Sequence, residues 1–205
     1  MLMNRHEELV AIIREAGIVG MGGAGFPTSV KLTPAEGKTI EKLIINGAEC
    51  EPYITSDYRE LLENTNSVLG GIKLIMKNLE IPRAIIGVEA DKPEAIEKLR
   101  KLTAPTPAIK VVTLRSRYPQ GAEKVLIHST TGRVVMEGEL PSDQKVIVMN
   151  VSTTAFIYKY IQTGIPLLRR RITIEGNAVG KPMNVIAPIG TMITELLREA
   201  QTDTE

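Results

Sequence analysis

Apolar runs alternate with helix-like segments between residues 40 and 164, and this alternation constrains the fold more than any other feature of the sequence. The first run, TIEKLIIN at 39–46, has the composition of a buried strand. Three similar runs follow, RAIIGVE, AIKVVTLR and QKVIVMN. Strands and helices that alternate in this way predict an α/β fold with a mostly parallel sheet and helices on both of its faces.

The segments between the predicted strands carry apolar residues at helical spacing. A short amphipathic helix that ends at Gly17 is expected before the first strand, because glycine commonly terminates helices. After the first strand, the pattern predicts one long helix over 57–79, weakened by Gly70 and Gly71. The remaining predicted helices run from Asp91 to about Leu102, from Gly121 onward, and from Ser152 to Gln162.

The pattern changes after Pro166, where a strand, a glycine-containing turn, a second strand and a helix from about Thr191 are expected. We therefore predict a main α/β domain over residues 1–166 and a partial second module over residues 167–205. The second module is too short to close a sheet of its own, so we expect the natural protein to continue beyond Glu205.

Charge and cysteine content narrow the possible functions. The net charge of +1 gives no indication of nucleic acid binding, and the Arg169–Arg171 run is short enough to be a solvated or strand-flanking patch. Cys50 is the only cysteine, which excludes a disulfide framework and a four-cysteine zinc or iron–sulfur site within this sequence. With no signal peptide and no apolar run near the ~20 residues of a membrane span, we expect a cytoplasmic protein without a metal site.

A glycine-rich stretch, GIVGMGGAGFPTSVKL at 17–32, contains Gly20, Gly22 and Gly25 in the G-x-G-x-x-G order of a dinucleotide-binding turn. A Rossmann turn needs a strand before the glycines and a helix directly after them. Here a predicted helix precedes them, and the following FPTSVKLTPAEG indicates an extended loop. The context favours a backbone cradle for a planar ligand or a phosphate over a Rossmann turn, with a flexible turn as the alternative.

Polar segments follow three of the predicted strands, at 46–52, 117–124 and 150–154. Because ligands of parallel sheets bind beyond the carboxyl ends of the strands, these loops and the glycine stretch are expected to form one site. Phe26 offers an aromatic face, Lys31 a charge for a phosphate, and Glu49 and Glu51 carboxylates for ribose hydroxyls or ring N–H groups. The alternatives stay open: Lys31 suits an ordinary surface position, and the polar residues at 121–123 and 150–153 suit helix starts. Cys50, between two acids, is interpreted as a packing residue.

Four motifs together, GIVGMGGAGFPTSVKL, LIINGAECEPYIT, RYPQGAEK and NVSTTAF, resemble the C subunit of Rnf-type electron transport complexes. That subunit is related to the flavin-bearing NADH dehydrogenase subunit of respiratory complex I. Similar modules occur in cobalamin reductases and in an electron-transfer protein of proline reductase. Those two systems, and a non-catalytic assembly domain of the same fold, are the alternative functions.

The resemblance implies a domain that binds FMN, takes a hydride from NADH and passes single electrons to iron–sulfur clusters on a missing segment or partner, with ferredoxin or a similar acceptor beyond them. It further implies a β-grasp module from about Arg169 and a peripheral position on the inner face of the cell membrane, beside the other subunits of a complex. Carried over by position, the residues implied to hold the flavin are Gly20, Gly22, Gly23, Lys31, Asn46, Glu49, Gly121, Asn150 and Thr153. Those implied to face NADH are Phe26, Glu51 and Glu123.

Overall fold

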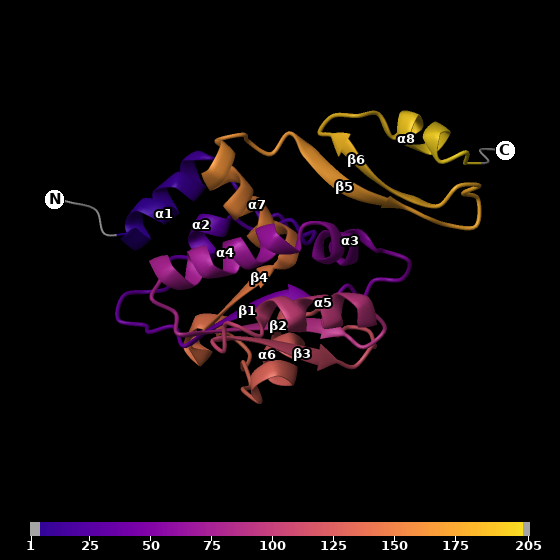
Figure 1. Cartoon of the computed structure of the whole chain (residues 1–205). Helices are drawn as coiled ribbons and strands as arrows, with labels where there is room; N and C mark the ends of the chain where they lie inside the picture. Colours follow the sequence, from indigo (N-terminus) through magenta and orange to yellow (C-terminus); the bar gives the residue numbers. More distant parts are fainter. Residues whose placement is uncertain (1–4, 203–205) are drawn as a thin grey trace.

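A four-stranded parallel sheet forms the centre of the computed structural model, which describes residues 5–202 (Figure 1). The strand order is β3-β2-β1-β4, so the first strand in the sequence is central, and Ile44 lies opposite both Ile85 and Val148. The parallel sheet confirms the predicted fold class. The strands are β1 (Lys42–Gly47), β2 (Arg83–Glu89), β3 (Ile109–Leu114) and β4 (Val146–Asn150).

Helices cover both faces of the sheet unequally (Figure 1). The larger core lies between one face and five helices, into which Leu43 and Ile45 of β1 project. Ile44, the residue between them, projects into a smaller core that α6 covers with Leu126 and Ile127. The five helices on the larger face are α1 (Arg5–Glu15), α3 (Ser56–Glu63), α4 (Thr65–Asn78), α5 (Pro93–Thr103) and α7 (Val151–Thr163), while α6 spans Glu123–Thr131.

The single helix predicted over 57–79 is wrong in one respect: the chain forms two helices, α3 and α4, that meet at Asn64. Asn64 leaves helical geometry, with φ −119° and ψ 27°, and asparagine has a low helix propensity. The helix continues through Gly70 and Gly71 because α7 packs against them closely. A Cβ at Gly71 would lie 2.1 Å from the carbonyl oxygen of Thr154, so only glycine permits this contact.

The C-terminal part forms a separate two-stranded antiparallel sheet of β5 (Arg169–Ile174) and β6 (Met183–Pro188), followed by α8 (Ile193–Glu199). This hairpin, at the orange-to-yellow end of the chain in Figure 1, contacts the main body at α3. Arg171 belongs to the run interpreted as a solvated patch, but its side chain is only 12% exposed and pairs with Glu63 of α3 at 2.5 Å. Asn184 donates to the hydroxyl of Thr55 at 2.7 Å on the same surface.

Candidate functional site

A pocket of about 600 Å³ opens at the carboxyl edge of the parallel sheet. The glycine stretch and the three loops expected to converge all contribute to its wall. The residues selected from the sequence that line it are Gly20, Gly22, Gly23, Phe26, Lys31, Asn46, Glu49, Glu51, Gly121, Glu123, Asn150 and Thr153. The structure therefore brings all the predicted positions together, and their individual roles toward a ligand stay predictions.

The glycine stretch folds into a narrow loop between α1 and the short helix α2 (Thr28–Lys31). The amide of Gly20 donates to the carbonyl of Phe26 at 2.8 Å and closes the loop. Gly23 and Gly25 have φ of +110° and +62°, values that side chains disfavour. Within the described residues, α1 and no strand precedes the loop, which confirms that it is not a Rossmann turn. The extended loop predicted after it is wrong at 28–31, where α2 forms and carries Lys31 to the pocket.

Two side chains from distant elements hold the glycine loop at Met21. The hydroxyl of Thr153, in the first turn of α7, accepts the Met21 amide at 2.8 Å. Arg170 of β5 donates to the Met21 carbonyl at 2.9 Å. A Cβ built on the next residue, Gly22, would lie 3.2 Å from Nδ2 of Asn150, so the loop packs tightly against that side chain. The loop is thus fixed from both α7 and the C-terminal hairpin.

Asn46 joins the loops that follow β1 and β3. Its Nδ2 donates to the carbonyl of Gly121 at 2.9 Å, and its Oδ1 accepts the amide of Ala48 at 3.1 Å. A Cβ at Gly121 would lie 2.7 Å from the carbonyl oxygen of Ala48, so glycine is required for this approach. The sulfur of Cys50 accepts the Gly121 amide at 3.3 Å, which agrees with a packing role.

Glu49 binds the N-terminus of α3. Its Oε1 accepts the hydroxyl of Ser56 at 3.0 Å and the amide of Asp57 at 2.9 Å, while Oε2 accepts the amide of Tyr58 at 3.1 Å. A carboxylate in this position satisfies free N–H groups and favours the positive end of the helix. Glu51, two residues further, is exposed at the pocket wall.

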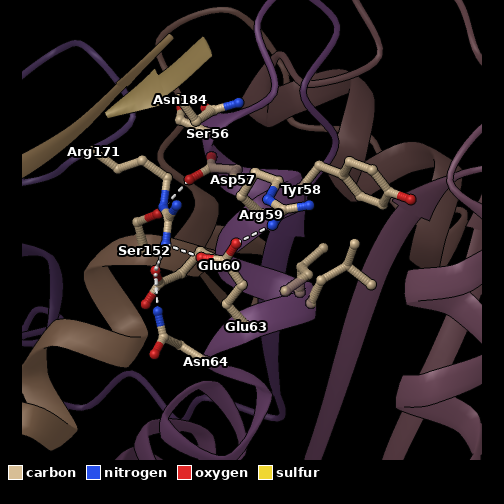
Figure 2. Close-up of polar contacts among 12 residues, drawn as sticks. Ser56, Asp57, Tyr58, Arg59, Glu60, Glu63, Asn64, Ser152, Arg171 and Asn184 are labelled. Atoms are coloured by element: carbon tan, nitrogen blue, oxygen red, sulfur yellow. Dashed lines mark hydrogen bonds and ion pairs between the residues drawn. The ribbon is translucent and has the colours of Figure 1, made fainter. Parts of the chain in front are cut away.

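Asp57, which the sequence reasoning missed, lies in the pocket wall beside Asn150. Its Oδ2 accepts a hydrogen bond from Nδ2 of Asn150 at 2.6 Å. Its Oδ1 accepts one from the hydroxyl of Ser152, and Figure 2 shows Asp57 and Ser152. The pKa of Asp57 is raised to about 6, and burial is the largest cause. The nearby carboxylates of Glu49 and Glu60 contribute to the rise, while the hydrogen bonds from Ser152 and Asn150 oppose it. In the sequence, Asp57 looks like any acidic residue at the start of a helix. Only its contacts with the start of α7 show that it belongs to the site.

An ion pair and two exposed aromatic rings complete the wall. Lys31 Nζ lies 2.6 Å from Glu123 Oε1, which joins α2 to the start of α6. Phe26 is 48% exposed, and Tyr118, which the sequence reasoning did not select, is 68% exposed. The pocket therefore combines a glycine-lined backbone wall, one cation, several carboxylates and exposed aromatic surface.

Over residues 5–202, no group of three or more His, Cys, Asp or Glu side chains is placed to hold a metal ion. No helix in the same range has the length and apolar character needed to span a membrane.

The fold and this pocket define an α/β protein with a small-molecule site at the carboxyl edge of a parallel sheet. The sequence model of the Nuo51 FMN-binding domain matches residues 13–159, and the chain belongs to that family.

Curated relatives agree with this assignment. The chain is 48% identical over 191 residues to the C subunit of the proton-translocating ferredoxin:NAD+ oxidoreductase complex of Clostridium ljungdahlii, covering 93% of this chain and 42% of that protein. It is 44% identical over 179 residues to the C subunit of the Na+-translocating complex of Acetobacterium woodii, covering 87% and 40%. The resemblance to Rnf-type C subunits is confirmed. The chain spans about two fifths of the length of these two relatives.

Among solved structures, the crystal structures of an NAD+-reducing NiFe-hydrogenase in its air-oxidized and H2-reduced states are similar to this chain. Each gives a TM-score of 0.83 over 96% of this chain and 39% of the hydrogenase chain. The sequence identity is 21%, so this similarity concerns the fold.

Proposed function

We propose that the pocket binds FMN and NADH together and that the chain is the NADH-oxidising flavin domain of a ferredoxin:NAD+ oxidoreductase complex. The observation that carries this proposal is the single pocket formed by four separate loops in a member of an FMN-binding family. Bound FMN would supply the central chemistry, accepting a hydride from NADH and releasing its electrons one at a time.

The residues of the pocket fit this cofactor. A volume of about 600 Å³ lies within the range typical of small-molecule sites. Gly22 and Gly23 are exposed, so this part of the wall presents backbone on which a planar ring can lie. Side chains on these glycines would occupy that space or strain the loop, since Gly23 has φ +110° and a Cβ at Gly22 would press on Asn150.

We assign two groups of residues to binding of the flavin. The glycine loop, Asn150 and Thr153 would contact one side of the flavin, and Asn46 and Gly121 would contact the other side. Lys31 would supply the positive charge for the phosphate. Its ion pair with Glu123 keeps the ammonium group at the pocket wall. Glu49 would act through α3, because both of its carboxylate oxygens already accept hydrogen bonds there.

For NADH, we assign Phe26, Glu51 and Glu123. Phe26 and Glu51 are exposed at the pocket wall, where a second, exchangeable ligand can reach them. The ring of Phe26 would stack on the dinucleotide, and the carboxylate of Glu51 would accept ribose hydroxyls.

Electrons would leave this chain through another segment or subunit, because one cysteine cannot hold an iron–sulfur cluster of the usual kind. The relatives are named as subunits of ferredoxin:NAD+ oxidoreductase complexes, so we propose that the acceptor is ferredoxin, reached through partner subunits at the membrane. We further propose a domain boundary near residue 166, with β5, β6 and α8 forming part of a β-grasp module.

FMN loading tests the proposal. The purified chain, incubated with FMN and desalted, should retain one flavin per chain with an absorbance spectrum shifted from that of free FMN. Riboflavin, which lacks the phosphate, is the matched control ligand and should be retained much more weakly. A chain that retains neither ligand contradicts the proposed function.

A further inference from the structure

Asp57 is the meeting point of hydrogen bonds from two pocket elements, and it belongs to neither of the ligand-facing sets assigned above. It sits at the start of α3, while both of its donors, Asn150 and Ser152, belong to the start of α7. Asn150 Nδ2 can reach the carboxylate at 2.6 Å only with the amide in one of its two orientations, because the amide oxygen cannot donate. The carboxylate therefore sets which way the Asn150 amide points.

The orientation of Asn150 has consequences beyond Asp57. With its nitrogen on Asp57, its Oδ1 accepts the amide of Thr153 at 3.1 Å and caps α7. Thr153 in turn accepts the Met21 amide of the glycine loop at 2.8 Å. Gly22 packs directly on the Asn150 side chain. One amide orientation thus links α3, α7 and the glycine loop across the pocket.

The location of Asp57 makes a purely stabilising role a poor explanation. Glu49 binds the N-terminus of the same helix, and Glu60 lies one turn further along it, so two other carboxylates face the same region. The pKa of Asp57 is raised to about 6, chiefly by burial, so its charged form is less favourable in the folded chain than in the unfolded chain. Ionisable groups with a strongly shifted pKa in a pocket wall are typical of functional sites.

We propose that Asp57 is a positioning residue that fixes the Asn150 amide, and through it the wall of α7 and the glycine loop, for cofactor binding. This inference rests on the proposed function, since it concerns the FMN pocket. Asp57 acts through Asn150 and makes no contact with the flavin in this account.

Two substitutions at Asp57 distinguish the effect of its hydrogen bond to Asn150 from the effect of its negative charge. Asp57→Ala removes the acceptor, while Asp57→Asn keeps an oxygen for Asn150 and can donate to the hydroxyl of Ser152. We expect Asp57→Ala to weaken FMN binding about tenfold or more and Asp57→Asn to stay within about threefold of the natural chain. Asp91→Ala, which removes an exposed acid outside the pocket wall, is the matched control and should leave binding unchanged.

The test is a double-mutant cycle with Asn150→Ala, measured by FMN fluorescence titration of the whole 205-residue chain. If Asp57 acts through Asn150, Asp57→Ala has almost no further effect in the Asn150→Ala background. Equal losses in both backgrounds, or an Asp57→Asn variant as weak as Asp57→Ala, would overturn the inference. Asp57→Ser, whose hydroxyl ends one bond short of the carboxylate oxygens, replaces Asp57→Ala if the alanine variant does not fold.

Hydrogen exchange of the flavin-free chain separates failure of this inference from failure of the proposed function. The amides of Thr153 and Met21 should exchange about tenfold faster in Asp57→Ala and at the natural rate in Asp57→Asn. If the natural chain takes up no FMN, the proposed function fails, and the exchange rates still decide the role of Asp57. Unchanged exchange rates at both amides in Asp57→Ala would refute the positioning role of Asp57.

Discussion

Valine at Gly22 should remove most of the affinity for FMN and leave the sheet folded. A Cβ at this position would lie 3.2 Å from Nδ2 and 3.4 Å from Cγ of Asn150, closer than most real Cβ contacts. The two further methyl groups of valine force Asn150 to move, which breaks its hydrogen bond to the carboxylate of Asp57 at 2.6 Å. A hydrogen bond to a charged group contributes about 1.5–3 kcal/mol. In the proposed site FMN binds the arrangement that this hydrogen bond holds, so restoring that arrangement against the valine costs binding energy of this size, which corresponds to a roughly 10- to 150-fold weaker binding constant.

The assay is a fluorescence titration of FMN with the natural chain and with Gly22→Val, accompanied by circular dichroism. Gly37→Val is the matched control, because Gly37 has φ +79° with open space around it and does not line the pocket. That control should lose about 1–2 kcal/mol of stability from backbone strain and keep its affinity for FMN. A Gly22→Val chain that stays folded and binds FMN normally would refute the assigned site, and an unfolded one would show that the loop is needed for folding.

Three further predictions address NADH, electron exit and pH. Phe26→Ala and Glu51→Gln should retain FMN but raise the KM for NADH about five- to thirty-fold, since each removes about 1–2 kcal/mol of NADH binding. Loss of flavin, or unchanged NADH kinetics, would show that these residues are wrongly assigned. The FMN-loaded chain should oxidise NADH with artificial acceptors but reduce no ferredoxin on its own, because Cys50 is its only cysteine; ferredoxin reduction by this chain alone would contradict the proposed exit route. Because the pKa of Asp57 is raised from 3.8 to about 6 in the folded state, the folded chain binds more protons than the unfolded chain between these values. The Asp57 contribution to the free energy of unfolding should therefore fall by about 3 kcal/mol as pH rises from about 3 to about 7, with most of the fall between about pH 4 and about pH 6. Urea unfolding of the natural chain and of Asp57→Asn measures this contribution as their difference, and parallel pH profiles would count against it.

The sheet and the position of the pocket could be predicted because they depend on local patterns. Runs such as RAIIGVE form strands wherever they can be buried on both faces, and β2 occupies the predicted residues. Once the strands are parallel, their carboxyl ends share one edge, so Asn46 and Asn150 come together although they are distant in sequence.

The features that sequence reasoning missed depend on contacts between distant elements. From the sequence, Arg171 is expected to be part of a basic surface run. In the structure, β5 places it against Glu63. Asn64 ends α3 inside a continuous apolar pattern, and α4, which begins at the next residue, packs on α7. Asp57 has no motif, and its importance arises from Asn150, which lies 93 residues away in the chain. No local pattern carries such information, so the contacts within the site are less predictable than its location.

Anaerobic titration of the FMN-loaded chain with NADH tests the central claim most directly, because it requires both ligands to occupy the one pocket. We predict that the flavin absorbance bleaches in proportion to added NADH, with an end point at one NADH per bound flavin, and that Glu51→Gln reaches the same end point only at higher NADH concentration. A chain that holds FMN whose absorbance does not change on addition of NADH would contradict the account.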